Sequence, residues 1–332
     1  MSEAKVPVTV LTGFLGAGKT TLVNWLLTQQ HGQRMAVIVN EFGEIGIDQD
    51  LIFNADEEIF EMNNGCLCCT VRGDLNRILS QLEKRRDQFD RVLVETTGLA
   101  NPGPVVLTFL WDEAIQEHFA LDGVITVVDA MHIERHLDEC EEARAQIAFA
   151  DVFVLNKVDL VEQADLERLE QRLRHTNTIA RIYHCEQARV PLDVLLNLGG
   201  FDLERALTVN PNFFKHLEDD SDLVDHDPMH HHHDDEIGSV SLELEGALDP
   251  ALARTWLSML LLERGLDIYR TKGVLHLADR DERFVFQSVH MLFDGLPGGP
   301  WGADRPINRL VFIGRHLDRA FLERGLHACL QR

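Results

Sequence analysis

The chain has 332 residues and a formal net charge of -24 at pH 7. Such a charge repels the phosphates of nucleic acids and anionic lipid headgroups, so we expect neither as a partner. No apolar run reaches the roughly 18 residues that a membrane helix needs, and the first residues lack a signal-peptide pattern, which together predict a cytoplasmic protein. The hydrophobic fraction of 45% is sufficient for one large domain and a smaller one.

Apolar runs alternate with amphipathic stretches over residues 1–207, which predicts an α/β domain with a parallel sheet covered by helices. The strands are apolar almost throughout, as expected when helices cover both faces. We expect strands at residues 6–12, 35–40, 91–95, 123–129, 152–156 and 180–183, and helices at 19–29, 71–84, 133–148 and 162–175.

Acidic residues and histidines replace apolar residues over 208–236. Because this segment has too little apolar content to form a core, we expect a flexible linker there. The pattern of residues 237–332 predicts a smaller α+β domain with an antiparallel sheet. Its expected strands are 238–245, 268–277, 283–289 and 309–313, and its expected helices are 250–263 and 317–330.

The segment GFLGAGKT at residues 13–20 is a full match to the phosphate-binding pattern GxxxxGK[ST]. Its backbone N–H groups are expected to hold phosphate oxygens at the start of a helix, and its glycines permit tight dihedrals. We expect Lys19 to neutralise the β- and γ-phosphates and Thr20 to bind Mg²⁺. A strand–helix turn without a ligand is the alternative. The predicted nucleotide-binding residues of this loop are Gly13, Gly16, Ala17, Gly18, Lys19, Thr20 and Thr21.

Two downstream strand ends add to this prediction. Glu95 ends the expected strand 91–95 and is predicted to contact Mg²⁺ through water or to position the attacking water, with an exposed carboxylate as the alternative. Asn156, Lys157 and Asp159 form an NKxD motif whose aspartate accepts hydrogen bonds from guanine but not from adenine, which favours GTP over ATP. Asp48 is a further candidate for positioning water, so the predicted catalytic set is Lys19, Glu95 and Asp48.

Cys66, Cys68 and Cys69 form a CxCC cluster between the phosphate loop and Glu95. Thiolates are soft ligands that suit Zn²⁺ and similar ions, and Zn²⁺ normally takes four ligands. The fourth is expected from Glu41 or Glu44, from water or from a partner, and an open position suits metal delivery. Buried cysteines, a structural metal site and a redox-sensing cluster are the alternatives.

A run of four histidines lies inside the expected linker. We interpret it as an auxiliary metal reservoir, because such runs bind metals weakly, with an inert solvated linker as the alternative. The run comprises His230, His231, His232 and His233.

In the order GFLGAGKTTL, NEFGE, GCLCC, ETTG, VVDA and NKVD, these motifs resemble the CobW-type P-loop GTPases, whose wider relatives include nickel-insertion GTPases. The resemblance extends over nearly the whole chain, because residues 300–302 and 310–314 are similar to the family's C-terminal domain. It implies GTP hydrolysis coupled to delivery of a transition metal, often Zn²⁺. It also implies that the CxCC thiols bind the metal. The sequence contains no identifiable catalytic glutamine or arginine finger, so we expect slow turnover.

The leading hypothesis is therefore a metallochaperone that uses GTP, Mg²⁺ and Zn²⁺ (or Co²⁺) and serves a client metalloprotein. GTP is expected to order residues 40–48 and the cysteine loop into one metal site. A cobalt-enzyme assembly factor of the cobalamin or nitrile hydratase type is one alternative. A redox-sensing GTPase switch is another, and homo-oligomerisation stays open.

Overall fold

The computed structural model describes residues 5–29, 32–40, 58–62, 69–200, 237–302 and 304–331, with only the backbone at 40, 58–62 and 69–72. The chain divides into two compact units, one made by Met1–Arg172 with Ala180–Gly200 and the other by Leu173–Ile179 with Phe201–Arg332. The linker expected at 208–236, including His230 to His233, lies outside the described residues. Among the helices that are described, none has the length and apolar character of a membrane span.

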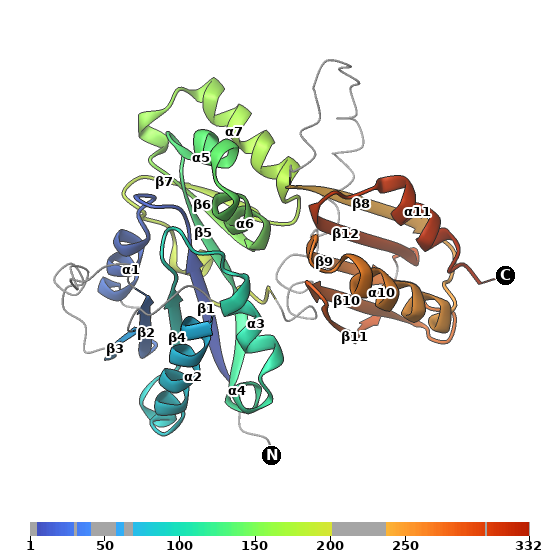
Figure 1. Ribbon diagram of the computed structural model, residues 1–332, viewed down its shortest axis with the longest axis horizontal. Coiled ribbons are helices and arrows are strands. Elements are labelled where there is room, and N and C mark those ends of the chain that lie inside the picture. The colour runs from blue at the N-terminus through green and yellow to red at the C-terminus, as the bar shows by residue number, and fades with distance from the viewer. Residues whose placement is uncertain are drawn as a thin grey trace. The chain divides into compact units, whose positions relative to one another are not determined.

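The first unit is built on a seven-stranded sheet with the order β3-β2-β4-β1-β5-β6-β7 (Figure 1). Every neighbouring pair in it is parallel, so all the strands end at the same edge. Strands β4 and β6 are buried at every residue, as both faces are covered. The strands are β1 Val6–Thr12, β2 Met35–Asn40, β3 Glu58–Met62, β4 Arg91–Glu95, β5 Phe119–Asp129, β6 Val152–Asn156 and β7 Arg181–Cys185.

Helix α1 packs on one face of this sheet. Its residues Leu22, Val23 and Leu26 belong to a buried cluster with alternate residues of the strands, such as Leu93 and Ile125. Figure 1 shows α3 on the other side of the strands from α1. The helices are α1 Lys19–Thr28, α2 Cys69–Glu83, α3 Gly103–Trp111, α4 Glu113–His118, α5 Ile133–Glu139, α6 Glu141–Phe149, α7 Gln163–Thr176 and α8 Leu192–Leu195, with 3₁₀ turns η2 Arg86–Gln88 and η3 Val158–Leu160.

The second unit contains a five-stranded antiparallel sheet with the order β11-β10-β9-β12-β8. Leu257 and Leu261 of α10 and Leu322 of α11 are buried in one cluster with strand residues such as Phe312. Asp249 caps α10 by accepting hydrogen bonds from the backbone of the first turn. The elements are β8 Ile237–Glu245, α10 Pro250–Arg264, β9 Ile268–Leu275, β10 Glu282–Val289, β11 Leu292–Pro300, β12 Ile307–Arg315 and α11 Arg319–His327.

The predicted fold class, a parallel P-loop sheet followed by a smaller antiparallel α+β domain, is confirmed. The single helix expected at 133–148 is wrong. Cys140 adopts an extended backbone, with φ -126° and ψ 122°, and separates α5 from α6. Strand β11 was not predicted, because its glycines and prolines are unfavourable in most strands; it lies at the sheet edge, where they are tolerated.

Candidate functional site

The candidate site lies where the seven parallel strands end. Open parallel sheets bind ligands outside the carboxyl ends of their strands, at the point where the strand order reverses. Here β1 is central, and the chain moves to one side for β2, β3 and β4 and to the other for β5, β6 and β7. The last residues across this edge are, in order, Met62, Asn40, Glu95, Thr12, Asp129, Asn156 and Cys185.

The phosphate loop connects β1 to α1 at the centre of this edge. Lys19 is 9% exposed, and its ammonium group donates hydrogen bonds to the backbone oxygens of Gly13, at 2.8 Å, and of Phe14, at 3.3 Å. Among the described side chains, none caps the start of α1. The backbone N–H groups of the first turn point toward this end of the helix, where the helix dipole favours an anion.

Two loop glycines pack too closely against neighbouring strands to carry a side chain. Gly13 has φ +139°, and a Cβ atom there would lie 2.2 Å from the backbone oxygen of Val127 in β5. Gly18 has φ +107°, and its Cβ atom would lie 2.6 Å from Nδ2 of Asn156 in β6. Gly16 has φ +74° but open space around it. Gly13 and Gly18 thus allow the loop to pack closely against the sheet, whereas Gly16 is needed only for the conformation of the turn itself.

Thr20 and Glu95, both predicted to act on Mg²⁺, lie close together. The Thr20 hydroxyl donates to Oε1 of Glu95 over 3.4 Å, and Glu95 is 4% exposed. Hydroxyl and carboxylate oxygens are the hard ligands that Mg²⁺ prefers, so this pair fits the ion. The chain after β4 also meets the phosphate loop, because a Cβ atom on Gly98 would lie 2.7 Å from the Leu15 nitrogen. Thr21, next along α1, is exposed.

The NKxD residues lie at the end of β6. Asn156 is 3% exposed, and its Nδ2 donates to the backbone oxygen of Ala17 in the phosphate loop at 2.9 Å. Its Oδ1 accepts from the Ala188 backbone N–H at 2.9 Å and from the Cys185 thiol at 3.5 Å. Asn156 therefore connects the phosphate loop to the segment that follows β7. Asp159, predicted to contact guanine, is exposed in the 3₁₀ turn η3.

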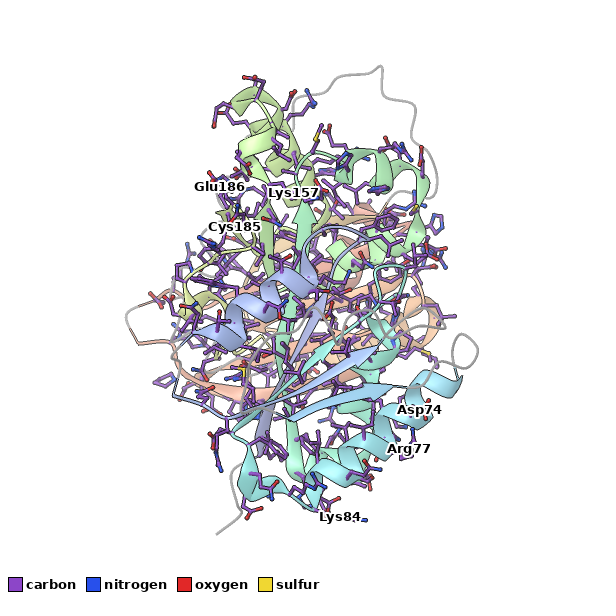
Figure 2. All side chains as sticks on the ribbon, turned by 90° about the vertical axis from the view of Figure 1, so that its left-hand side faces the viewer. Asp74, Arg77, Lys84, Lys157, Cys185 and Glu186 are labelled. Atoms are coloured by element: carbon purple, nitrogen blue, oxygen red, sulfur yellow. The ribbon has the colours of Figure 1, made fainter. Side chains whose placement is uncertain are left out.

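Sequence reasoning did not identify the segment from Cys185 to Ala188 as part of the site. Figure 2 shows Cys185 and Lys157 at the same end of the sheet, in agreement with the pairing of Asn156 with Cys185 between β6 and β7. Ala188 has φ 55°, which turns the backbone toward Asn156. Burial raises the pKa of the Cys185 thiol to about 12, so it remains a neutral donor. The only sequence signal was its position after an expected strand.

Asp129 at the end of β5 was noted in the sequence only as part of the VVDA motif. Its Oδ2 atom lies 2.7 Å from the Lys157 ammonium and 3.0 Å from Nδ1 of His132. Burial by itself would raise the pKa of Asp129, but the hydrogen bonds from Lys157 and His132 outweigh burial and lower it. Asp129 is therefore a charged partner of the NKxD lysine.

The expected metal ligands fall mainly outside the described residues. Glu41, Glu44, Cys66 and Cys68 are outside them, as is Asp48, the candidate for positioning water, and Cys69 is described only as the first backbone position of α2. Within the described part of the chain, no three His, Cys, Asp or Glu side chains are grouped to hold a metal. Two segments carry the expected metal ligands: the NEFGE segment, which starts at the end of β2, and the CxCC segment, which follows β3. The last residues of these strands, Asn40 and Met62, are paired.

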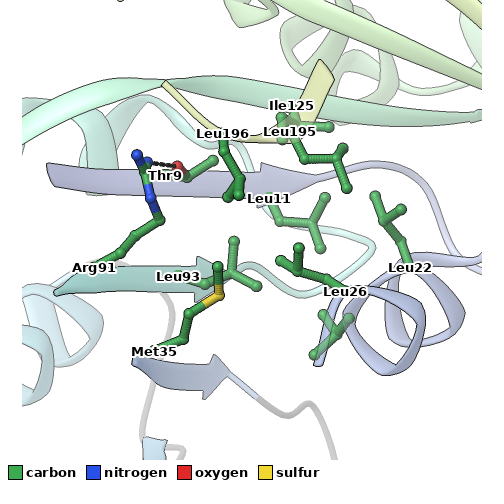
Figure 3. Close-up of a pocket in the computed structure, with 11 residues that line it drawn as sticks. Thr9, Leu11, Leu22, Leu26, Met35, Arg91, Leu93, Ile125, Leu195 and Leu196 are labelled. Carbon is green, nitrogen blue, oxygen red and sulfur yellow. Dashed lines mark hydrogen bonds between the residues drawn. The ribbon is translucent and has the colours of Figure 1, made fainter. Parts of the chain in front are cut away.

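A cavity of about 10 Å³ lies between the sheet and helix α1, away from the edge where the strands end (Figure 3). It is lined by apolar residues such as Leu11, Leu26 and Leu93, and its volume is about that of one water molecule. Arg91 borders it and donates to Thr9 at 3.0 Å and to Asp122 at 2.6 Å. The cavity is thus a packing feature of the core that cannot hold a nucleotide.

Comparisons with known proteins agree with this arrangement. Residues 7–184 match the CobW/HypB/UreG nucleotide-binding domain, and residues 237–330 match the cobalamin synthesis protein cobW C-terminal domain. The zinc chaperone YjiA of Escherichia coli is 36% identical over 316 residues, covering 94% of this chain and 95% of that protein. The zinc-regulated GTPase metalloprotein activator 1 of Schizosaccharomyces pombe is 32% identical, covering 97% and 80%.

Solved structures give the same result for the fold. The crystal structure of Zn(II)-bound YjiA GTPase from E. coli superposes with a TM-score of 0.77 at 30% identity, covering 99% of this chain and 100% of that one. This likeness extends through both sheets, so the family resemblance found in the motifs is confirmed. The chain belongs to the CobW/HypB/UreG family of nucleotide-binding proteins and carries the CobW C-terminal domain.

Proposed function

We propose that this protein is a GTP-hydrolysing metallochaperone that binds Zn²⁺ or a similar ion at Cys66, Cys68 and Cys69 and delivers it to a client metalloprotein. The order of the strand ends carries the proposal. The phosphate loop follows the central strand β1, the guanine motif follows β6 on one side, and the NEFGE and CxCC segments follow β2 and β3 on the other. On that side of the central strand, β4 comes first, and β2 and β3, which lead into the two segments proposed to bind metal, come next.

The phosphate side of the site explains how GTP is held. Backbone N–H groups from Gly16 to Thr20 accommodate phosphate oxygens. Lys19 is already oriented at the mouth of the loop by the carbonyls that its ammonium contacts, so a short movement brings it to the β- and γ-phosphates. Thr20 and Glu95 would hold Mg²⁺, which neutralises charge on the phosphate oxygens.

The guanine side uses the NKxD residues. Asp159 is exposed, so its carboxylate is accessible to accept hydrogen bonds from guanine N1–H and the exocyclic amine. Asn156 and Lys157 contribute by shaping the surrounding turn, since Asn156 is bonded to both flanking loops. Adenine lacks the two donors, and the unpaired aspartate would disfavour ATP.

Chain connectivity supports a shared metal site. Paired parallel strands lie about 4.8 Å apart, so the NEFGE and CxCC segments begin close together, after Asn40 and Met62. Cys66 follows Met62 by four residues and therefore lies within about 14 Å of it. Glu41 follows Asn40 directly. A tetrahedral Zn²⁺ site with three thiolates and one carboxylate, from Glu41 or Glu44, is consistent with these tethers.

The same topology supports coupling between GTP and metal. Strand β2 pairs directly with β4, with Val39 opposite Glu95, so the segment after β2 begins beside the proposed Mg²⁺ ligand. In the GTP state the metal segments are ordered into one site, and hydrolysis loosens them for transfer. Asp48, in the segment after β2, is assigned to positioning the attacking water, and Asp48→Asn is expected to slow hydrolysis.

The relatives support the choice of metal, since they are named as zinc chaperones and as a zinc-regulated GTPase metalloprotein activator. We assign a client metalloprotein by the same analogy, and we propose a cytoplasmic location from the sequence pattern. The histidine run His230 to His233 is assigned an auxiliary role in collecting metal. Removing it is expected to lower the total metal bound but to leave the affinity of the CxCC site unchanged.

The proposal is tested by measuring Zn²⁺ affinity with a competing chelator in the nucleotide-free protein, with Mg²⁺-GDP and with Mg²⁺ and a non-hydrolysable GTP analogue. We expect the tightest binding with the analogue and loss of that binding in Cys68→Ala. Cys140→Ala is the matched control, because Cys140 lies far along the chain between α5 and α6. Equal affinity in all three states would contradict coupled delivery. If the two sites are coupled, Zn²⁺ must strengthen analogue binding by the same factor.

A further inference from the structure

The carboxylate of Asp129 contacts polar groups from two neighbouring turns. It ends β5, pairs with Asn156 across the ladder to β6, and is 7% exposed. Its Oδ2 faces the Lys157 ammonium at 2.7 Å and His132 Nδ1 at 3.0 Å, and its Oδ1 accepts from the Met131 backbone N–H at 3.0 Å. One carboxylate thus joins the turn after β5 to the turn after β6.

Lys157 occupies an unusual backbone position. Its φ of 63° and ψ of 32° lie in the left-handed region, which residues with a Cβ atom rarely adopt. This turn directs the chain from the buried Asn156 to the exposed Asp159. The Lys157 side chain is 31% exposed and the Asp129 side chain 9%, so their attraction is weakened by water less than that of a surface pair. The ion pair therefore holds the lysine in one direction.

We propose that Asp129 is a positioning residue for guanine nucleotide binding, which holds the Lys157 side chain and its left-handed turn in the arrangement that the base requires. This inference rests on the GTP binding proposed above. A long, flexible lysine loses conformational freedom when it is ordered against a ligand. Prior fixation by Asp129 removes part of that loss before the nucleotide arrives, which strengthens binding without any contact between Asp129 and the nucleotide.

The fold itself does not depend on the charge of Asp129. The two turns are also joined by a backbone hydrogen bond from Ala130 N–H to the Asn156 oxygen at 3.0 Å, and the His132 N–H donates to the Asp129 backbone oxygen at 3.2 Å. In Asp129→Asn, the amide oxygen can still accept from Met131. The substitution therefore removes the charge that attracts Lys157 and keeps the turn, so the variant is expected to fold.

The test compares wild type, Asp129→Asn, Lys157→Met and the double variant. The dissociation constants of fluorescently labelled GDP and of a labelled non-hydrolysable GTP analogue are measured by titration, and kcat is measured at saturating GTP. We expect Asp129→Asn to weaken both nucleotides by about three- to tenfold, with a much smaller change in kcat. Because Asp129 acts through Lys157, adding Asp129→Asn to Lys157→Met should have no further effect.

Asp138→Asn is the matched control. Asp138 lies on α5 in the same unit and pairs with Arg172 of α7, so the same change breaks an ion pair away from the NKxD turn, and it should leave nucleotide affinity unchanged. Unchanged affinity in Asp129→Asn, or an equal loss in the presence and absence of Lys157, would overturn the inference. Wild type that binds neither nucleotide would instead overturn the proposed function itself.

Discussion

Replacing Asn156 with alanine is expected to destabilise the nucleotide site on the side where the guanine base is proposed to bind. The truncation removes the donor to the Ala17 oxygen and the acceptor for the Ala188 N–H, which are bonded at 2.9 Å each and lie in fully buried residues. Leaving a buried polar group without its partner costs about 1–3 kcal/mol. Two such groups therefore lower the free energy of unfolding by about 2–6 kcal/mol. The Cys185 thiol is a weak donor and adds little.

The assay is urea unfolding of the nucleotide-free protein, followed by tryptophan fluorescence. Trp25 is a suitable reporter, because its indole Nε1 donates to the Val190 oxygen at 3.0 Å, just beyond Ala188. The chain has two compact units, so the curve is fitted with two transitions and the one that includes the Trp25 signal is compared.

Asn76→Ala provides the matched control for this prediction. Asn76 makes a side-chain hydrogen bond to Asp112 at 3.0 Å in a partly buried position, so its loss is expected to cost about 0.5–1.5 kcal/mol. A loss of less than about 1 kcal/mol in Asn156→Ala, or one no larger than in the control, would refute the view that Asn156 holds the two loops together.

Three further predictions concern the first unit. Asp122→Ala leaves the Arg91 guanidinium buried without the carboxylate now 2.6 Å away, and urea unfolding should show a loss of about 3–5 kcal/mol. Gly13→Ala should abolish binding of labelled GDP because of its clash with a strand carbonyl, whereas Gly16→Ala adds only strain of about 1–2 kcal/mol; equal effects would contradict this difference. Burial raises the pKa of the Cys185 thiol from 9.0 to about 12, so the folded state keeps the proton at a pH where the unfolded state loses it. The contribution of this thiol to the free energy of unfolding is therefore present below pH 9.0 and is lost as the pH rises toward 12. The stability difference between wild type and Cys185→Val should shrink over that range, and a constant difference would contradict the assignment.

Local sequence patterns were sufficient for the central elements. The predicted bounds of β1, β2, β4 and β6 are those in the structure, since short apolar runs bounded by polar residues have few alternatives in a parallel sheet. The prediction of one helix at 133–148 was wrong because the amphipathic periodicity of the sequence continues through Cys140, whereas the backbone at Cys140 is extended. The edge strand β11 was not predicted because its composition is atypical of a strand; in the structure it pairs with β10 at the edge of the sheet.

The sequence by itself determined the phosphate loop and the guanine motif, because each is a set of neighbouring residues whose spacing is dictated by the ligand. Only the tertiary structure decided which residues support them. Asp129 meets Lys157, and Ala188 meets Asn156, across 28 and 32 residues of sequence. Such contacts depend on strand order and register, which follow from the packing of the whole sheet and are not encoded in any local pattern.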